Sequence, residues 1–263
     1  MIIIAGPCVI ESEDILLQIA KELQPLSKNK NINFYFKSSF DKANRTSIDS
    51  FRGPGIKHGL EILSKIKKDF GFKILTDIHK TSQIDKAAKV VDIIQIPAFL
   101  CRQTDLLVEA AKKDCIINIK KGQFLQPQDM QYQIKKVLNT RGIKNISYDI
   151  SKKAKIYSTE RGFSFGYGNL VVDMRSLYIL RQYSPVIFDA THCVQSSSGD
   201  GHTSGNRTFV PILARGAAAV GVDGFFYETH IDPDSALSDS ANMLDIKSLY
   251  SSIDEVLKIS KIL

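Results

Sequence analysis

The sequence contains no tryptophan, no pair of cysteines with CxxC spacing and no hydrophobic run long enough to cross a membrane. Widely separated cysteines argue against a disulfide framework and for a reducing compartment; they are Cys8, Cys101, Cys115 and Cys193. Of these, we expect the last three to be structural. The apolar start, MIIIAGPCVIES, lacks the basic leader and cleavage pattern of a signal peptide. We therefore expect a cytoplasmic protein.

Low-complexity segments, linkers and short-period repeats are absent as well, so residues 1–263 are expected to form one catalytic domain. Hydrophobic residues make up 43% and charged residues 24%, which is ordinary for a globular protein. The length suits two small domains or one α/β barrel of about 250 residues. A net charge of +7 could indicate binding to nucleic acid, to an anionic membrane or to anionic metabolites. Because the lysines are spread through helical segments, we expect sites for small anions and no nucleic-acid or membrane partner.

Short apolar segments alternate with segments of helical periodicity along the whole sequence. The apolar segments are rich in β-branched residues, as strands buried on both faces are. Eight strand–helix units predict a closed (β/α)8 TIM barrel, with a doubly wound open sheet as the alternative. No GxGxxG motif follows the first strand, which counts against dinucleotide binding. The expected strands are 2–5, 32–36, 73–76, 93–96, 116–119, 156–158, 186–188 and 224–227, and the expected helices are 14–27, 56–69, 82–90, 103–113, 128–139, 174–182, 208–220 and 246–259.

A reactive or polar cluster follows almost every expected strand. In a (β/α)8 barrel the carboxyl ends of the strands converge on one mouth, where such enzymes keep their active sites. One cluster could arise by chance, whereas a series in phase with the strands indicates an enzyme with a cation-rich site. The clusters are GPC at 6–8, KSSFDKANR at 37–45, TDIH at 76–79, QIPAF at 95–99, KKGQ at 120–123, TERG at 159–162, DATH at 189–192 and ETH at 228–230.

The second cluster continues into a loop, KSSFDKANRTSIDSFRGPG at 37–55, that concentrates cations among small hydrogen-bonding side chains. Arginine offers a fixed fork of donors and lysine a point charge, and both suit phosphate or carboxylate oxygens. Interleaved hydroxyls and an amide suit a polyol, so the loop predicts a site for an anionic sugar. The alternative is a solvated basic loop. The cations are Lys37, Lys42, Arg45 and Arg52.

Other cations should join this loop at the mouth of the barrel, because they end the fifth and sixth strands. So many like charges in one pocket predict at least two anionic groups on the substrates. The expected pocket cations are Lys37, Lys42, Arg45, Lys120 and Arg161. One or two of them should instead pair with Asp41, Asp77 or Glu160, since unpaired buried charges are costly.

Cys8, His192 and Glu228 end the first, seventh and eighth strands, which become neighbours when the barrel closes. Thiolate, imidazole and carboxylate together suit Fe²⁺, Zn²⁺ or Mn²⁺ rather than Mg²⁺. Asp239, in the following loop, could supply a fourth ligand. The alternative is that Cys8 is a small core residue and His192 a hydrogen-bonded one, because no close ligand spacing supports a metal.

Taken together, the clusters resemble the 3-deoxy-D-manno-octulosonate 8-phosphate synthase family. The resemblance covers nearly the whole chain, and it implies a (β/α)8 barrel that condenses phosphoenolpyruvate with D-arabinose 5-phosphate and releases inorganic phosphate. It also implies a homotetramer, no organic cofactor, and a product that feeds lipopolysaccharide synthesis. The matching stretches are IAGPCVIES, FKSSFDKANRTSIDSFRGPG, LTDIH, DIIQIPAFLCRQTDLL, NIKKGQF, TERGFSFGYGNLVVDMRSL, FDATHCVQ and ETHIDPDSALSD.

The resemblance also implies substrate-binding roles for individual residues. Arg102 is similar to the arginine that a neighbouring subunit lends to the sugar phosphate. Thr46 stands where the family commonly has serine, and the loop 196–207 ends in SGNR where many members read SGG. The implied phosphoenolpyruvate site is Lys37, Ser38, Lys42, Lys120 and Arg161, and the implied sugar site is Asn44, Arg45 and Thr46.

The same resemblance favours a metal-dependent enzyme. Cys8 follows AGP as in the metal-dependent members, whereas the metal-independent members have asparagine there. Proton transfer could involve Asp77 or His79. The implied divalent-metal ligands are Cys8, His192, Glu228 and Asp239, and the candidate catalytic residues are Lys42, Asn44, Asp77 and His192.

Rival functions stay open at this point. The sibling heptulosonate 7-phosphate synthase takes erythrose 4-phosphate, although KANR at 42–45 favours the pentose enzyme. A Schiff-base aldolase would use Lys120. A phosphate- or nucleic-acid-binding protein without catalysis would fit the positive charge, but no basic surface interleaved with aromatic residues supports it.

Overall fold

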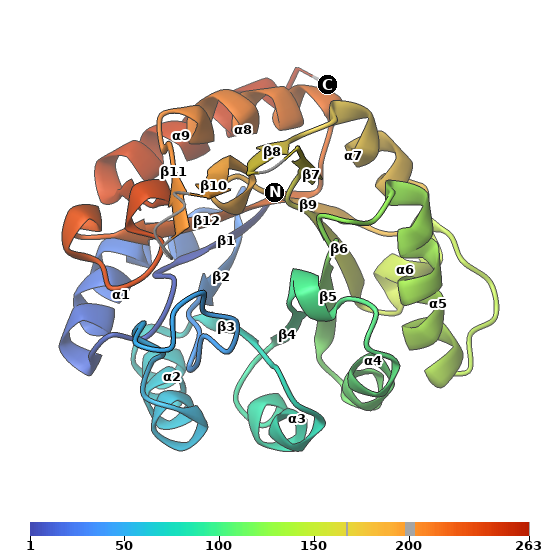
Figure 1. Ribbon diagram of the computed structural model, residues 1–263, viewed down its shortest axis with the longest axis horizontal. Helices are drawn as coiled ribbons and strands as arrows, with labels where there is room; N and C mark the ends of the chain where they lie inside the picture. Colours follow the sequence, from blue (N-terminus) through green and yellow to red (C-terminus); the bar gives the residue numbers. More distant parts are fainter. Residues whose placement is uncertain (167, 198–202, 263) are drawn as a thin grey trace.

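The computed structural model describes residues 1–166, 168–197 and 203–262. Within them, parallel strands form a closed ring in which β1 pairs with both β2 and β12 (Figure 1). This closure confirms the predicted barrel and excludes the open sheet. The order around the ring is β1 (Ile2–Gly6), β2 (Asn33–Lys37), β3 (Lys73–Asp77), β4 (Ile93–Ile96), β5 (Ile116–Lys120), β6 (Ile156–Glu160), β9 (Val186–Asp189) and β12 (Gly224–His230).

Helices surround the ring and connect successive strands (Figure 1). Local signals set their ends: the Ser12 side chain accepts a hydrogen bond from the Ile15 N–H at the first helix, and the second ends at Gly71 with a left-handed φ of 69°. None of the described helices combines the length and apolar character needed to cross a membrane. The helices are α1 (Glu13–Lys28), α2 (Ile56–Phe70), α3 (Thr81–Ala88), α4 (Thr104–Ala111), α5 (Met130–Thr140), α6 (Tyr148–Lys153), α7 (Met174–Arg181), α8 (Phe209–Val220) and α9 (Ile246–Ile259).

The barrel separates the apolar core into two layers. One layer fills the inside of the ring and consists of Ile4, Tyr35, Leu75, Ile93, Ile187 and Phe226. The larger layer lies between strands and helices, where each strand buries its outward side chains. The larger layer includes Cys101, Cys115 and Cys193, which confirms that these three cysteines are structural.

The sequence did not predict a small antiparallel sheet with the strand order β11-β10-β8-β7. Its strands come from the two long loops that follow β6 and β9, so the sheet belongs to the carboxyl-terminal side of the barrel. Three-residue strands are too short to show an alternating pattern, and their pairing joins segments distant in the sequence. The strands are β7 (Phe163–Phe165), β8 (Asn169–Val171), β10 (Gln195–Ser197) and β11 (Thr203–Gly205), and a two-residue β13 (Leu244–Asp245) pairs with β12.

Candidate active site

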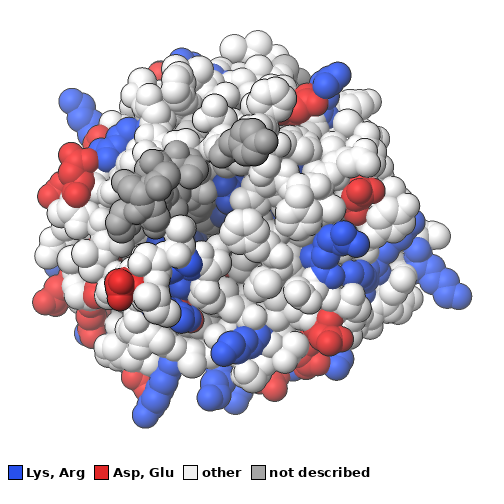
Figure 2. All heavy atoms as spheres, viewed as in Figure 1, with Lys and Arg blue, Asp and Glu red and all other residues white. Residues whose placement is uncertain are grey.

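A polar pocket of about 220 Å³ opens at the carboxyl ends of the strands, and recessed lysine and arginine atoms are visible in a central hollow (Figure 2). The strand-end clusters therefore converge as predicted. Their side chains reach the pocket from most strands of the ring. The predicted site residues that line it are Lys37, Lys42, Asn44, Arg45, Thr46, Asp77, Lys120, Arg161, His192, Glu228 and Asp239.

A close approach of β1 to β2 positions Lys37 at one side of the pocket. A Cβ atom on Gly6 would lie 2.1 Å from the Lys37 carbonyl oxygen, so a larger residue would push the strands apart. The buried Lys37 ammonium donates hydrogen bonds to the Cys8 carbonyl at 2.7 Å and to a Glu228 carboxylate oxygen. One cation thus joins the ends of β1, β2 and β12.

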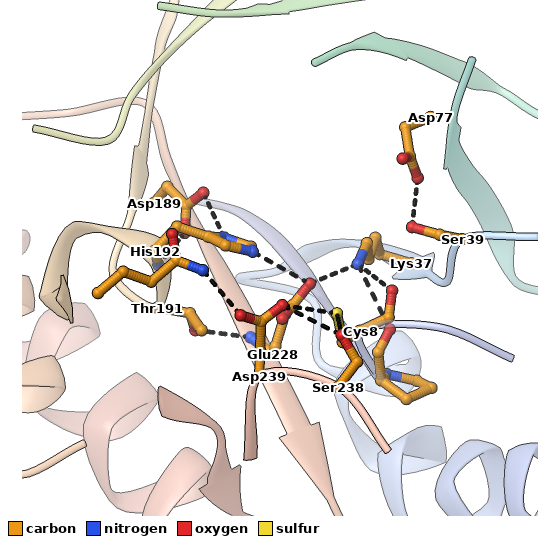
Figure 3. Close-up of polar contacts among 12 residues, drawn as sticks. Cys8, Lys37, Ser39, Asp77, Asp189, Thr191, His192, Glu228, Ser238 and Asp239 are labelled. Atoms are coloured by element: carbon orange, nitrogen blue, oxygen red, sulfur yellow. Dashed lines mark hydrogen bonds and ion pairs between the residues drawn. The ribbon is translucent and has the colours of Figure 1, made fainter. Parts of the chain in front are cut away.

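The predicted metal ligands lie together at this side of the pocket (Figure 3). Ligand atoms of Cys8, Glu228 and Asp239 are within 4.8 Å of one another. The Cys8 thiol donates a hydrogen bond to Asp239 Oδ2 at 3.0 Å and lies 2.9 Å from the Ser238 hydroxyl. His192 Nε2 is 3.5 Å from Glu228 Oε1. Closing the barrel has therefore brought one sulfur, one imidazole and two carboxylates together.

This group of side chains fits a divalent transition metal. Glu228 Oε2 is buried and has no hydrogen-bond partner among the described residues. His192 Nδ1 lies 2.8 Å from Asp189 Oδ2, an arrangement that commonly orients a ligating histidine. Burial, followed by the charges of Asp239 and Glu228, raises the pKa of the Cys8 thiol. A cation would favour the thiolate, and these donors suit Fe²⁺, Zn²⁺ or Mn²⁺.

Lys120 lies on the Nδ1 side of the His192 ring, opposite the Nε2 atom that faces Glu228. Its ammonium lies 2.6 Å from Asp189 Oδ2 and 3.3 Å from His192 Nδ1, and 4.0 Å from the centre of the Phe226 ring. Burial lowers the pKa of Lys120, although the Asp189 charge opposes this effect. Asp189 therefore organises both a cation and an imidazole.

The expected carboxylate partners of the pocket cations were wrong. Lys37 and Lys120 are paired, which agrees with the expected one or two, but their partners are Glu228 and Asp189. Asp41 instead pairs with Arg52 at the surface, and Glu160 pairs with Lys121, neither of which lines the pocket. Pairing in the barrel follows which strand ends face each other, and sequence proximity does not reveal this.

Asp77 lines the pocket and is fixed from both sides. Its Oδ1 accepts a hydrogen bond from the Ser39 hydroxyl, and its Oδ2 lies 3.0 Å from His79 Nε2. Burial alone would raise the pKa of Asp77, but the His79 hydrogen bond and the charge of Lys42 outweigh it and hold the pKa well below its usual range. Asp77 is consequently a carboxylate at neutral pH.

Two cationic donors in the pocket lack a partner among the described residues. Arg45 Nε donates to the Phe51 carbonyl at 2.9 Å, while its Nη2 is buried and unpaired. Arg161 Nη2 donates to the His192 carbonyl at 2.9 Å, while its Nε is likewise buried and unpaired. Burial would lower the pKa of Lys42, but neighbouring anionic groups raise it overall. Buried unpaired donors on cations are the groups that an anionic ligand satisfies.

Two predicted substrate residues do not line the pocket. Ser38 is fully buried behind it, with no hydrogen-bond partner for its hydroxyl among the described residues. Arg102 is exposed and lines a separate surface hollow with Tyr132 and Lys136. The chain does not bring its own Arg102 to its own pocket.

The sequence reasoning missed some lining residues. Gln95, Phe99 and Gln123 line the pocket and belong to the strand-end clusters QIPAF and KKGQ, so the signal was present. Gln195 also lines it; it follows the DATH cluster by three residues and ends the matching stretch FDATHCVQ, but no role was assigned to it. Within the loop 196–207, residues 198–202 lie outside the described residues.

Comparison with known proteins identifies the family of the chain. A family model described as the DAHP synthetase I family matches residues 1–262. A protein of Wolinella succinogenes named 2-dehydro-3-deoxyphosphooctonate aldolase is 60% identical over 263 residues, covering 100% of both chains. Proteins of the same name from Campylobacter jejuni subsp. doylei and Helicobacter acinonychis are 59% and 60% identical, covering 100% of this chain and 99% and 96% of theirs.

Proposed function

The chain belongs to the DAHP synthetase I family, and from this premise we propose that it has the 2-dehydro-3-deoxyphosphooctonate aldolase activity named in its relatives. In the synthetic direction, phosphoenolpyruvate, D-arabinose 5-phosphate and water give 3-deoxy-D-manno-octulosonate 8-phosphate and inorganic phosphate. The observation that carries the proposal is the pocket itself. It combines two arginines, whose buried donors Arg45 Nη2 and Arg161 Nε have no partner in the described part of the chain, with the small polar side chains of Asn44 and Thr46.

The reaction forms one carbon–carbon bond and breaks one phosphate ester. The methylene carbon of phosphoenolpyruvate bonds to the aldehyde carbon of the pentose, whose oxygen takes up a proton. Water adds to the neighbouring enol carbon, and the phosphorylated hemiketal then loses inorganic phosphate. We assign the phosphoenolpyruvate carboxylate and phosphate to Lys37, Lys42, Lys120 and Arg161, which hold the substrate in reacting geometry and stabilise the developing charge.

The sugar end is assigned to the loop 37–55. Arg45 would bind the anionic group through its unpaired Nη2, and Asn44 and Thr46 would bind hydroxyls. Asp77, already ionised, would accept a hydrogen bond from a substrate hydroxyl or the attacking water. His79 and Ser39 keep this carboxylate oriented.

Cys8, His192, Glu228 and Asp239 are the residues we assign to a divalent metal. A bound cation would supply Lewis-acid chemistry to an aldehyde or water oxygen. Asp189 would fix the His192 ring so that Nε2 faces Glu228. Lys120, which contacts the same carboxylate, couples this group to the assigned phosphoenolpyruvate site.

Phosphate release tests the proposal directly. We expect phosphoenolpyruvate with arabinose 5-phosphate to release phosphate, a chelator to abolish release, and Mn²⁺ or Zn²⁺ to restore it. Faster release with erythrose 4-phosphate would favour the heptulosonate enzyme. Borohydride treatment with substrate should leave Lys120 unlabelled, whereas labelling would favour a Schiff-base aldolase. No release with either sugar would reject the proposed activity.

We also propose a homotetramer in the cytoplasm whose product enters lipopolysaccharide synthesis, with Arg102 serving the pocket of a neighbouring copy. The exposure of Arg102 on its own chain, away from its own pocket, supports this assignment. Light scattering gives the oligomeric state. If Arg102→Ala leaves the KM for arabinose 5-phosphate unchanged, the shared role of Arg102 is wrong.

A further inference from the structure

Gln195 bridges the two charged halves of the pocket. Its Oε1 accepts a hydrogen bond from Arg161 Nη2 at 2.7 Å, and its Nε2 donates one to Asp239 Oδ1 at 2.8 Å. The guanidinium on one side and the carboxylate on the other fix which end of the amide faces which group. All three residues line the same pocket.

The residues that Gln195 connects are held on separate loops. Arg161 follows β6, Asp239 lies in the segment between β12 and β13, and Gln195 begins β10. Asp239 has a left-handed φ of 52°, which is uncommon outside glycine, so its backbone depends on surrounding contacts. The amide therefore joins three segments that no backbone ladder of the barrel connects.

The opposite charges of Arg161 and Asp239 would favour a direct ion pair between them, and the Gln195 amide stands between the two groups. A guanidinium and a carboxylate in one pocket attract each other, and a direct, bidentate pair would be stronger than hydrogen bonds to a neutral amide. Such a pair would occupy the donors of Arg161 and the oxygens of Asp239. A neutral side chain with one acceptor and one donor satisfies both groups while keeping them apart.

We propose that Gln195 is a positioning residue that prevents Arg161 and Asp239 from pairing, and so keeps the guanidinium available for a substrate anion. The inference rests on the proposed function, because the anion is phosphoenolpyruvate. Two geometric facts support it: Arg161 Nε is buried without a partner among the described residues, and Asp239 Oδ2 still contacts Cys8.

Calorimetric binding of phosphoenolpyruvate to the full chain, without the sugar and in the presence of a chelator, tests this role. In Gln195→Ala the guanidinium can turn to Asp239, and we expect binding to weaken at least about tenfold, the value of one charge-assisted hydrogen bond. In the double variant Gln195→Ala/Asp239→Asn the competing charge is gone, and binding should recover towards that of the wild type. A merely structural loss would not be repaired by a second substitution.

Gln195→Glu is the matched variant of equal length. Its carboxylate would itself pair with Arg161, so binding should stay weak even when Asp239→Asn is added. Wild-type affinity in Gln195→Ala, or no recovery in the double variant, would overturn the inference while leaving the proposed function intact. A wild-type protein that does not bind phosphoenolpyruvate would overturn the proposed function, and this inference with it.

Discussion

The ammonium group of Lys121 lies 3.4 Å from a carboxylate oxygen of Glu160, and neither side chain is exposed to solvent. Lys121 also donates to the Gly162 carbonyl at 3.2 Å and lies 3.6 Å from the centre of the Phe163 ring. Glu160 accepts hydrogen bonds from the Gly162 N–H at 2.6 Å and the Ser176 hydroxyl at 2.8 Å. The pair therefore fixes the loops after β5 and β6, beside two residues assigned to phosphoenolpyruvate.

Removing one partner of this pair should destabilise the protein strongly. Lys121→Met leaves the Glu160 carboxylate buried without its cation, and we expect the free energy of unfolding to fall by about 3–5 kcal/mol. Urea denaturation measures it. Lys112→Met, which removes an exposed pair with Glu109, is the control and should change nothing measurable. Equal effects of the two substitutions would contradict the structural role of the buried pair.

Substitutions of two of the buried cysteines, Cys8 and Cys193, should have different effects on the metal content of the protein. Cys8→Ala removes the sulfur from the assigned ligand group, so we expect purified protein to lose its divalent metal and its phosphate release. Cys193, whose thiol donates to the Ala190 carbonyl, points away from that group, and Cys193→Ala should retain both. Elemental analysis gives the result. Metal in Cys8→Ala at the wild-type level would reject the assigned ligand set.

Two arginines of the loop 37–55 make a second matched pair. Arg45 lines the pocket, and no described residue pairs with its Nη2, whereas Arg52 pairs with Asp41 at the surface. Arg45→Ala should raise the KM for arabinose 5-phosphate by about 10- to 100-fold, the value of a charge-assisted hydrogen bond. Arg52→Ala should leave it nearly unchanged. Steady-state kinetics at saturating phosphoenolpyruvate give the KM of each variant. A larger increase in KM for Arg52→Ala than for Arg45→Ala would show that the sugar assignment is wrong.

The stability of the protein should depend on pH through Asp77. Because its pKa is lower in the folded than in the unfolded protein, the folded state is favoured above the unfolded value. That stabilisation is lost as the pH falls below about 4 towards the folded pKa. The Asp77→Asn variant has no carboxylate to protonate and so lacks this pH-dependent stabilisation. Its free energy of unfolding should therefore fall less steeply than that of the wild type between about pH 4 and 2. Parallel curves for both proteins would show that Asp77 is not held in its ionised form.

Much of the fold follows from local pattern. The β-branched strands are buried on both faces, and their spacing by amphipathic helices is visible without any tertiary contact. Five cations could be assigned to one pocket, because strand ends meet at the mouth of a barrel: Lys37, Lys42, Arg45, Lys120 and Arg161. The short strands β7, β8, β10 and β11 could not be predicted, since they exist only through pairing with one another.

The sequence by itself determined the barrel and the cation-rich mouth, because both depend on periodicity or on a strand end. The family resemblance, and not the strand pattern, favoured Cys8, His192, Glu228 and Asp239 as metal ligands. Only the tertiary structure decided the pairing: Lys37 with Glu228, Lys120 with Asp189, and Gln195 between Arg161 and Asp239. These contacts join strands and loops far apart in the chain. Their partners are selected by barrel register and by the cost of leaving a buried charge unpaired, and neither has a local signature in the sequence.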